Sequence, residues 1–113
     1  MKPESRDVER INHIYEAILA IQSFTDNVSE IEFRESALIQ SAVIRQFEIL
    51  GEAASKVTEI TKEKYPEVEW RVIKDFRNLL IYEYFRIEVT EIWYSIQYDI
   101  PDLKRKIESI RSV

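Results

Sequence analysis

The chain has 113 residues, 45% of them apolar and 33% charged, a balance that fits one globular domain over residues 1–113. A single Gly, three Pro and no Cys favour a few long helices, and they exclude disulfides and thiolate metal sites. With no apolar signal region and no membrane-length apolar run, we expect a cytoplasmic protein that does not enter a membrane. The net charge of −5 argues against broad nucleic-acid wrapping but allows a small basic cleft.

The first half of the chain predicts two long helices. Apolar residues spaced mostly three and four apart predict an amphipathic helix over residues 6–24. Ser29 is followed three residues later by Glu32, the spacing of a capping box, which indicates a helical turn beginning there. A second long helix is predicted over about residues 34–63. Its candidate core residues are Leu38, Ile39, Ala42, Val43, Phe47, Ile49 and Leu50.

Gly51 lies inside this second predicted helix, next to the small residues Ala53, Ala54 and Ser55. Gly in a helix interior costs about 1 kcal/mol relative to Ala. The small-residue patch therefore suggests a close helix crossing, and a tolerated glycine without a role is the alternative.

The second half predicts two further helices. A polar connection ends at Pro66, and apolar spacings of three and four predict a third helix over about residues 68–84. A fourth begins near Val89 or Thr90. Pro101 is expected to kink or restart it, because proline removes a donor and clashes one turn back. The predicted fold is therefore all-α, a helical bundle.

Residues 77–84 read Arg-Asn-Leu-Leu-Ile-Tyr-Glu-Tyr. On an ideal helix Arg77 and Tyr84 share nearly one face, whereas Tyr82 lies about 140° around from Arg77. One helix therefore does not bring Arg77 and Tyr82 onto one phosphate. Either the helix end loosens here, or a second subunit faces the first across a symmetric cleft.

The octapeptide resembles the R-N-x-x-x-H-x-Y signature of the HepT-like toxins in the HEPN superfamily, with Tyr82 in place of histidine. The likeness extends to residues 45–54, to Trp70 and to Ile92-Trp93, and covers most of residues 8–110. The resemblance implies a HEPN-type bundle of four to five helices and a symmetric homodimer. It also implies a ribonuclease that cleaves RNA without a metal or another cofactor.

For such a cleavage, the guanidinium of Arg77 suits stabilisation of the phosphate, and Asn78 suits positioning of a phosphate or a ribose hydroxyl. The histidine of the signature suits proton transfer, because its pKa lies near neutrality. Tyr82 suits it poorly, since a phenol with a pKa of about 10 is deprotonated in only about one molecule in a thousand at pH 7. We therefore expect weakened or absent cleavage.

The resemblance gives Tyr84 a separate role. In HepT-like toxins the tyrosine two residues beyond the histidine receives AMP from a partner nucleotidyltransferase, the MntA-type antitoxin. By resemblance, Tyr84 is the modification site, and AMP there would oppose substrate phosphate by charge and bulk.

Three charged residues of the second predicted helix, Arg45, Glu48 and Glu52, share one face. They either support the cleft, with a carboxylate orienting Arg77 or a proton donor, or they are surface contacts at helical spacing. His13 is the only histidine and is remote from the motif in sequence. It cannot make a metal site alone, so we expect a surface or partly packed role.

Two hypotheses about the function of the protein follow. The first is a HepT-like toxin, resembling RNA endonucleases, paired with an MntA-like nucleotidyltransferase. The second is a non-catalytic HEPN dimer that binds or regulates that nucleotidyltransferase. Tyr82 favours the second, and Arg77, Asn78 and Tyr84 favour the first. A third possibility is that Tyr82 was introduced to make a toxic protein expressible.

Overall fold

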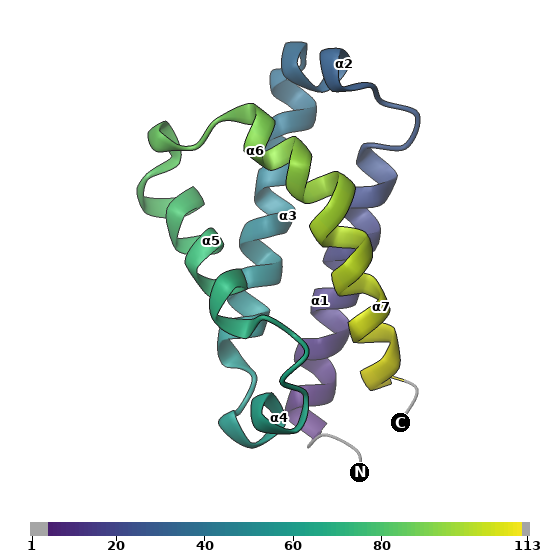
Figure 1. Ribbon diagram of the computed structural model, residues 1–113, viewed down its shortest axis with the longest axis vertical. Coiled ribbons are helices and arrows are strands. Elements are labelled where there is room, and N and C mark those ends of the chain that lie inside the picture. The colour runs from purple at the N-terminus through teal and green to yellow at the C-terminus, as the bar shows by residue number, and fades with distance from the viewer. Residues whose placement is uncertain (1–4, 112–113) are drawn as a thin grey trace.

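The computed structural model describes residues 5–111, and these residues contain helices and no strand, which confirms the all-α prediction. Four long helical stretches run along the molecule, and shorter helices join them (Figure 1). In chain order the elements are α1 (Ser5–Phe24), α2 (Glu30–Glu35), α3 (Ala37–Lys56), α4 (Glu59–Lys64), α5 (Trp70–Tyr82), the 3-10 turn η1 (Tyr84–Arg86), α6 (Val89–Tyr94), the π-helical turn η2 (Ser95–Asp99) and α7 (Ile100–Arg111).

The helix predicted over residues 34–63 is wrong, because α2, α3 and α4 replace it. The first break is at Ser36, whose side chain accepts a hydrogen bond from the backbone N–H of Ile39 and so caps α3. The second break is at Val57, where the backbone turns extended. Leu38, predicted to be in the core, is exposed because it lies in the first turn of α3 and faces away from the bundle.

The capping box predicted at the start of α2 is confirmed. The Ser29 hydroxyl accepts from the backbone N–H of Glu32 at 3.1 Å, and the Ser29 N–H donates to the Glu32 carboxylate at 2.9 Å. The carboxylate therefore satisfies a donor that the helix end would otherwise leave unpaired. The hydrogen bond from the Ser29 backbone N–H, together with a hydrogen bond from the Ser29 side chain to the same carboxylate, holds the pKa of Glu32 below its usual value.

A buried carboxylate from α1 caps α4. Asp7 accepts hydrogen bonds from the Thr58 backbone N–H at 3.1 Å, the Thr58 hydroxyl at 2.6 Å and the Thr61 hydroxyl at 2.5 Å. Burial raises the pKa of Asp7, but these hydrogen bonds and the charge of Arg10 outweigh burial and lower that pKa below its ordinary value. The contact fixes the start of α4 to the N-terminal turn of α1.

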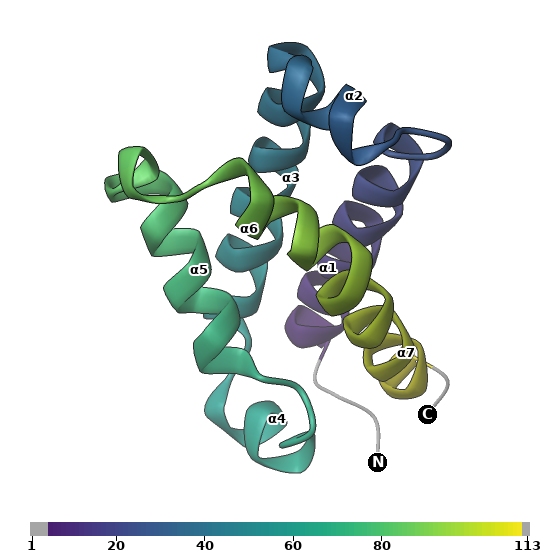
Figure 2. The ribbon, with the colours of Figure 1, turned by 45° about the horizontal axis from the view of Figure 1, so that its top comes forward.

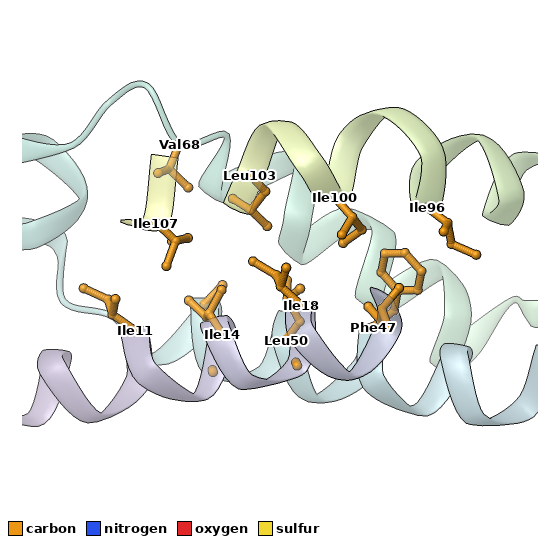
Figure 3. Packing of buried hydrophobic residues seen from close by; sticks show 14 of the residues in the cluster. Ile11, Ile14, Ile18, Phe47, Leu50, Val68, Ile96, Ile100, Leu103 and Ile107 are labelled. Carbon is orange, nitrogen blue, oxygen red and sulfur yellow. The ribbon is translucent and has the colours of Figure 1, made fainter. Parts of the chain in front are cut away.

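The core lies where α1, α3 and α7 meet, with α5 packed on the other flank of α3 (Figures 1 and 2). Figure 3 shows isoleucines of α1 opposite apolar residues of α7 and the π-helical turn. The residues labelled there are Ile11, Ile14, Ile18, Phe47, Leu50, Val68, Ile96, Ile100, Leu103 and Ile107. Burying side chains of this size contributes about 1.5–3 kcal/mol each, so this layer stabilises the arrangement of the three helices.

The disturbance expected at Pro101 takes the form of the π-helical turn η2 just ahead of it. The backbone N–H of Ile100 donates to the carbonyl of Ser95, five residues earlier, rather than to the residue four earlier. A wider turn moves the preceding carbonyls away from the proline ring, so the helical path continues from α6 into α7 (Figure 1). Within residues 5–111, none of the helices combines the length and apolar character needed to cross a membrane.

Candidate functional site

Helix α5 carries the motif and is shorter than the stretch predicted over residues 68–84. It begins at Trp70, whose indole N–H donates to the backbone carbonyl of Tyr65 at 3.0 Å. It ends at Tyr82, because Glu83 leaves the helical conformation with φ −139° and ψ 35°. Tyr84 therefore lies in η1 rather than on α5. Its predicted place on the helical face of Arg77 is wrong.

Arg77 is anchored at the crossing of α5 and α3. A Cβ atom added to Gly51 would lie 2.3 Å from the Cβ and 2.6 Å from the Cγ of Arg77. This spacing confirms the close helix crossing predicted at Gly51, and it identifies the side-chain stem of Arg77 as the group that fills the space. The arginine side chain is only 15% exposed as a result.

The guanidinium of Arg77 is held by Glu52, the residue next to Gly51 on α3. Arg77 Nη1 lies 2.8 Å from Glu52 Oε2, and Glu52 Oε1 lies 3.3 Å from Lys56 Nζ. Arg77 Nε is buried and has no hydrogen-bond acceptor among the described residues. The guanidinium is therefore directed by a carboxylate, while one of its donors remains unused, a cost that proteins rarely accept without a reason.

The remaining motif residues take no part in this ion pair. Asn78 is half-buried on α5, and Tyr82 is 73% exposed at the end of that helix. Tyr84 is 68% exposed in η1 and makes an edge-to-face contact with the ring of Phe85, with centroids 6.2 Å apart. Within one chain, the guanidinium of Arg77 is thus directed towards α3, whereas the rings of Tyr82 and Tyr84 are in solvent.

Arg45, Glu48 and Glu52 line one polar groove, which runs along the outer face of α3 and has a volume of about 470 Å³. Residues of α1 and Ile81 of α5 also line it. Arg45 Nη1 lies 3.3 Å from Glu48 Oε1. The groove, called the α3 groove below, is lined by Glu9, Arg10, His13, Arg45, Glu48, Ile49, Glu52, Ala53, Lys56 and Ile81.

The position of His13 in the α3 groove is a feature that sequence reasoning missed. His13 is exposed on α1, yet it lines the same groove as Glu52 and Ile81. Periodicity within α1 does not tell which part of α3 packs beside it, so no local pattern could have paired these residues.

A second hollow, of about 160 Å³, is lined by other residues of α5 and by α7 and has a different chemical character. Phe47 and Phe76 meet there edge to face with centroids 5.1 Å apart, and Val72, Ile100 and Leu103 also line it. Its mostly apolar lining does not suit a phosphate. The described residues contain no group of three or more His, Cys, Asp or Glu side chains that could hold a metal ion.

The fold and the site together define a small all-α protein with an Arg-Asn motif fixed at a helix crossing beside a polar groove. The chain belongs to the family described as "Ribonuclease HepT-like", which it matches over residues 14–110. This match confirms the resemblance on which the predicted site residues rest. The roles of those residues stay predictions.

Several curated relatives are similar along their length. The chain is 37% identical over 111 residues to "Probable ribonuclease HepT" of Thermococcus cleftensis, covering 98% of this chain and 99% of that protein. It is 34% identical over 106 residues to "Putative RNase MJ1380" of Methanocaldococcus jannaschii, covering 93% and 97%.

A third relative is a longer protein. The chain is 37% identical over 100 residues to "Gamma-glutamylcyclotransferase and putative RNase MJ0434" of Methanocaldococcus jannaschii, which covers 88% of this chain. The match spans only 45% of that relative's length. No solved structure gives a significant match.

Proposed function

We propose that this protein is the HepT-like toxin component of a toxin–antitoxin pair, a metal-independent RNA endonuclease whose cleavage is weakened or lost because Tyr82 replaces the histidine of the motif. The observation that carries the proposal is the anchored Arg77, packed on Gly51 and joined to Glu52 at 2.8 Å. Membership of a family described as ribonucleases supports RNA as the substrate.

In the proposed cleavage, each motif residue has one task. Arg77 binds the phosphate oxygens and stabilises the charge that develops in the transition state, because a preformed guanidinium needs little reorganisation. Asn78 positions the phosphate or a ribose hydroxyl. Position 82 transfers protons, and a neutral phenol there can donate a proton but is a poor base.

The active form is proposed to be a symmetric homodimer. Arg77 points towards α3, and Tyr82 is exposed on another side of α5, so one chain alone does not present both groups to a single phosphate. A second copy facing the first would supply the missing group to each site. The exposed aromatic rings of Tyr82, Tyr84 and Phe85 at the end of α5 favour burial in such an interface.

The proposed partner is an MntA-like nucleotidyltransferase that attaches AMP to Tyr84 in the cytoplasm. The 68% exposure of Tyr84, outside the regular helix, is compatible with entry into another enzyme's active site. AMP would add negative charge and bulk at the end of α5 and so repel RNA phosphates.

RNA cleavage by three purified forms tests the proposal. The unmodified protein is expected to cleave a single-stranded RNA slowly or not at all, and Tyr82→His is expected to accelerate cleavage by about 10²–10⁴-fold. Arg77→Ala in the Tyr82→His background should abolish the gain. Tyr98→His, a matched change at another exposed tyrosine, should not produce it. Failure of Tyr82→His to raise cleavage or cellular toxicity counts against a ribonuclease.

The alternative function is a non-catalytic dimer that binds or regulates the nucleotidyltransferase. The specific observation in its favour is Tyr82, because the proton-transfer group is the one motif element replaced. Co-purification with a nucleotidyltransferase encoded by a neighbouring gene, combined with no RNA cleavage by the Tyr82→His form, would favour this alternative.

A further inference from the structure

The α3 groove contains the only imidazole of the chain. His13 of α1 lines a groove that is also lined by Glu52 of α3 and Ile81 of α5. Histidine is the side chain whose ordinary pKa suits proton transfer at neutral pH. A group with the chemistry that Tyr82 lacks is therefore present beside the motif helix.

The groove and the Arg77 site are adjacent. Glu52 belongs to both, because it lines the groove and accepts a hydrogen bond from Arg77 Nη1. Ile81, also in the groove lining, lies four residues after Arg77 and hence one turn further along the same side of α5. Gly51 fixes the stem of Arg77 at the level of Glu52. Glu52 thus links the groove directly to the guanidinium of Arg77.

The charge of the groove also differs from that of the whole chain. Three basic residues, Arg10, Arg45 and Lys56, balance three acidic ones, Glu9, Glu48 and Glu52, whereas the chain carries −5 overall. Arg77 at its edge adds one more positive charge. Phosphate contacts need local positive charge rather than a basic protein, and this balanced groove repels a nucleotide less than the average surface does.

We propose that the α3 groove binds the ribonucleotide whose 2′-hydroxyl attacks, and that His13 is the general base for that attack. The proposal rests on the proposed RNA cleavage and deepens it. The charged groups that line the groove together with His13 are Glu9 and Arg10 on its own helix and Arg45, Glu48, Glu52 and Lys56 on α3, while α5 contributes Ile81.

Neutral His13 takes the proton of the 2′-hydroxyl, a bond forms between the 2′-oxygen and phosphorus, and the bond from phosphorus to the 5′-oxygen breaks. The leaving 5′-oxygen takes a proton from the phenol at position 82, and the phenolate formed recovers a proton from the imidazolium of His13 through water. The products are a 2′,3′-cyclic phosphate and a free 5′-hydroxyl.

A double-mutant cycle between positions 13 and 82 tests this role. Removing a well-matched base costs about 10²–10⁴-fold, so His13→Gln should lower the residual cleavage by the Tyr82 form by that factor. In the Tyr82→His background the loss should be at least tenfold smaller, because a second imidazole is then present. Glu16→Gln, at another exposed position of α1, should change neither rate.

The outcomes separate the proposal from the proposed function. Equal loss from His13→Gln in both backgrounds, or no loss, overturns the role of His13 and leaves the ribonuclease intact. Cleavage by the Tyr82→His form alone, with none by the Tyr82 form, also overturns it. Absence of cleavage in every form overturns both.

Nuclear magnetic resonance provides a readout that does not need activity. Because His13 is the sole histidine, its imidazole C–H signals are unique in the spectrum. Adding cytidine 3′-monophosphate should shift them, and Arg77→Ala should at least halve the shift if one ligand contacts both sites. Unchanged His13 signals at saturating nucleotide would place the ligand elsewhere and overturn the proposal.

Discussion

Gly51 of α3 and Arg77 of α5 lie against each other where the two helices cross, and the absence of a side chain at Gly51 makes room for the side chain of Arg77. The Cβ of Arg77 would be 2.3 Å from a Cβ at position 51, closer than real Cβ contacts come. The only glycine of the chain therefore sets the separation of α3 and α5 where the motif begins. The packing of α3 against α5 and the position of the Arg77 side chain therefore both depend on the contact between Gly51 and Arg77.

Gly51→Ala is predicted to destabilise the protein, although Ala is the better helix former by about 1 kcal/mol. The obstructing atom is the Cβ of Arg77, which moves only with its helix, so α3 and α5 must separate. Overpacking of this kind costs about 1–3 kcal/mol. Urea denaturation should show a lower midpoint.

Two variants complete that test. Ser41→Ala, at an exposed position of α3, introduces the same residue without the obstruction and should not lower the midpoint. Combining Gly51→Ala with Arg77→Gly removes the obstructing Cβ and should recover part of the loss. A stabilised Gly51→Ala protein would mean that the crossing is looser than the structure indicates.

Glu52→Ala is predicted to release the guanidinium of Arg77 without unfolding the protein. The pair is partly exposed, and ion pairs of that kind contribute about 0–1 kcal/mol to stability. The Nε–H of Arg77 is buried, so its exchange with water should be slow in the unchanged protein and faster in the variant. Arginine side-chain signals in ¹H–¹⁵N spectra measure this rate of hydrogen exchange.

Glu48→Ala, which removes the partner of Arg45, is the control. Equal exchange of the Arg77 Nε–H in the Glu52→Ala and Glu48→Ala proteins would refute the anchoring role of Glu52.

Asp7→Asn is predicted to destabilise the bundle by about 1–3 kcal/mol at neutral pH, because the Thr58 and Thr61 hydroxyls lose a charged acceptor. The pKa of Asp7 is lowered by these hydrogen bonds against the effect of burial. Its stabilisation is therefore fully present above the unfolded pKa of about 3.9 and is lost as the pH falls through the lower folded pKa.

Denaturation of both forms across pH measures that dependence. The difference in unfolding free energy between the unchanged protein and Asp7→Asn should be constant from pH 7 to about pH 5 and should shrink below the unfolded pKa. Asp26→Asn, at an exposed turn position, serves as the control with little effect. A difference that grows on acidification would contradict the lowered pKa.

Local pattern was sufficient for much of the fold. The apolar spacing gave α1 and most of α5, and the Ser29–Glu32 spacing gave the start of α2. It failed at Ser36 and Val57, because helix-like spacing continues through both breaks. The second break is fixed by Asp7, 51 residues earlier than Thr58, and no window along the sequence contains such a contact.

The same limit applies to the site. The motif identified Arg77, and the small-residue patch predicted a close crossing at Gly51, but neither identified the other as its partner. The face shared by Arg45, Glu48 and Glu52 followed from helical geometry, and the structure gathers it in one groove. His13 enters that groove from another helix. Its place depends on the register between α1 and α3, which tertiary packing sets.

Tyr84, rather than Tyr82, is predicted to receive AMP when the protein is incubated with ATP and the proposed MntA-like nucleotidyltransferase. Both rings are exposed, so exposure alone does not choose between them. Tyr82 is the last residue of α5, whereas Tyr84 begins the short turn η1, where three residues can adapt to a partner's active site more readily than a regular helix.

Proteolytic cleavage after Arg77 and Arg86 yields a peptide that contains both tyrosines, so fragmentation of that peptide in the mass spectrometer must show which tyrosine carries the AMP group. Tyr84→Phe should abolish it and Tyr82→Phe should retain it. The reverse result would place the modification at position 82, where the family signature has histidine.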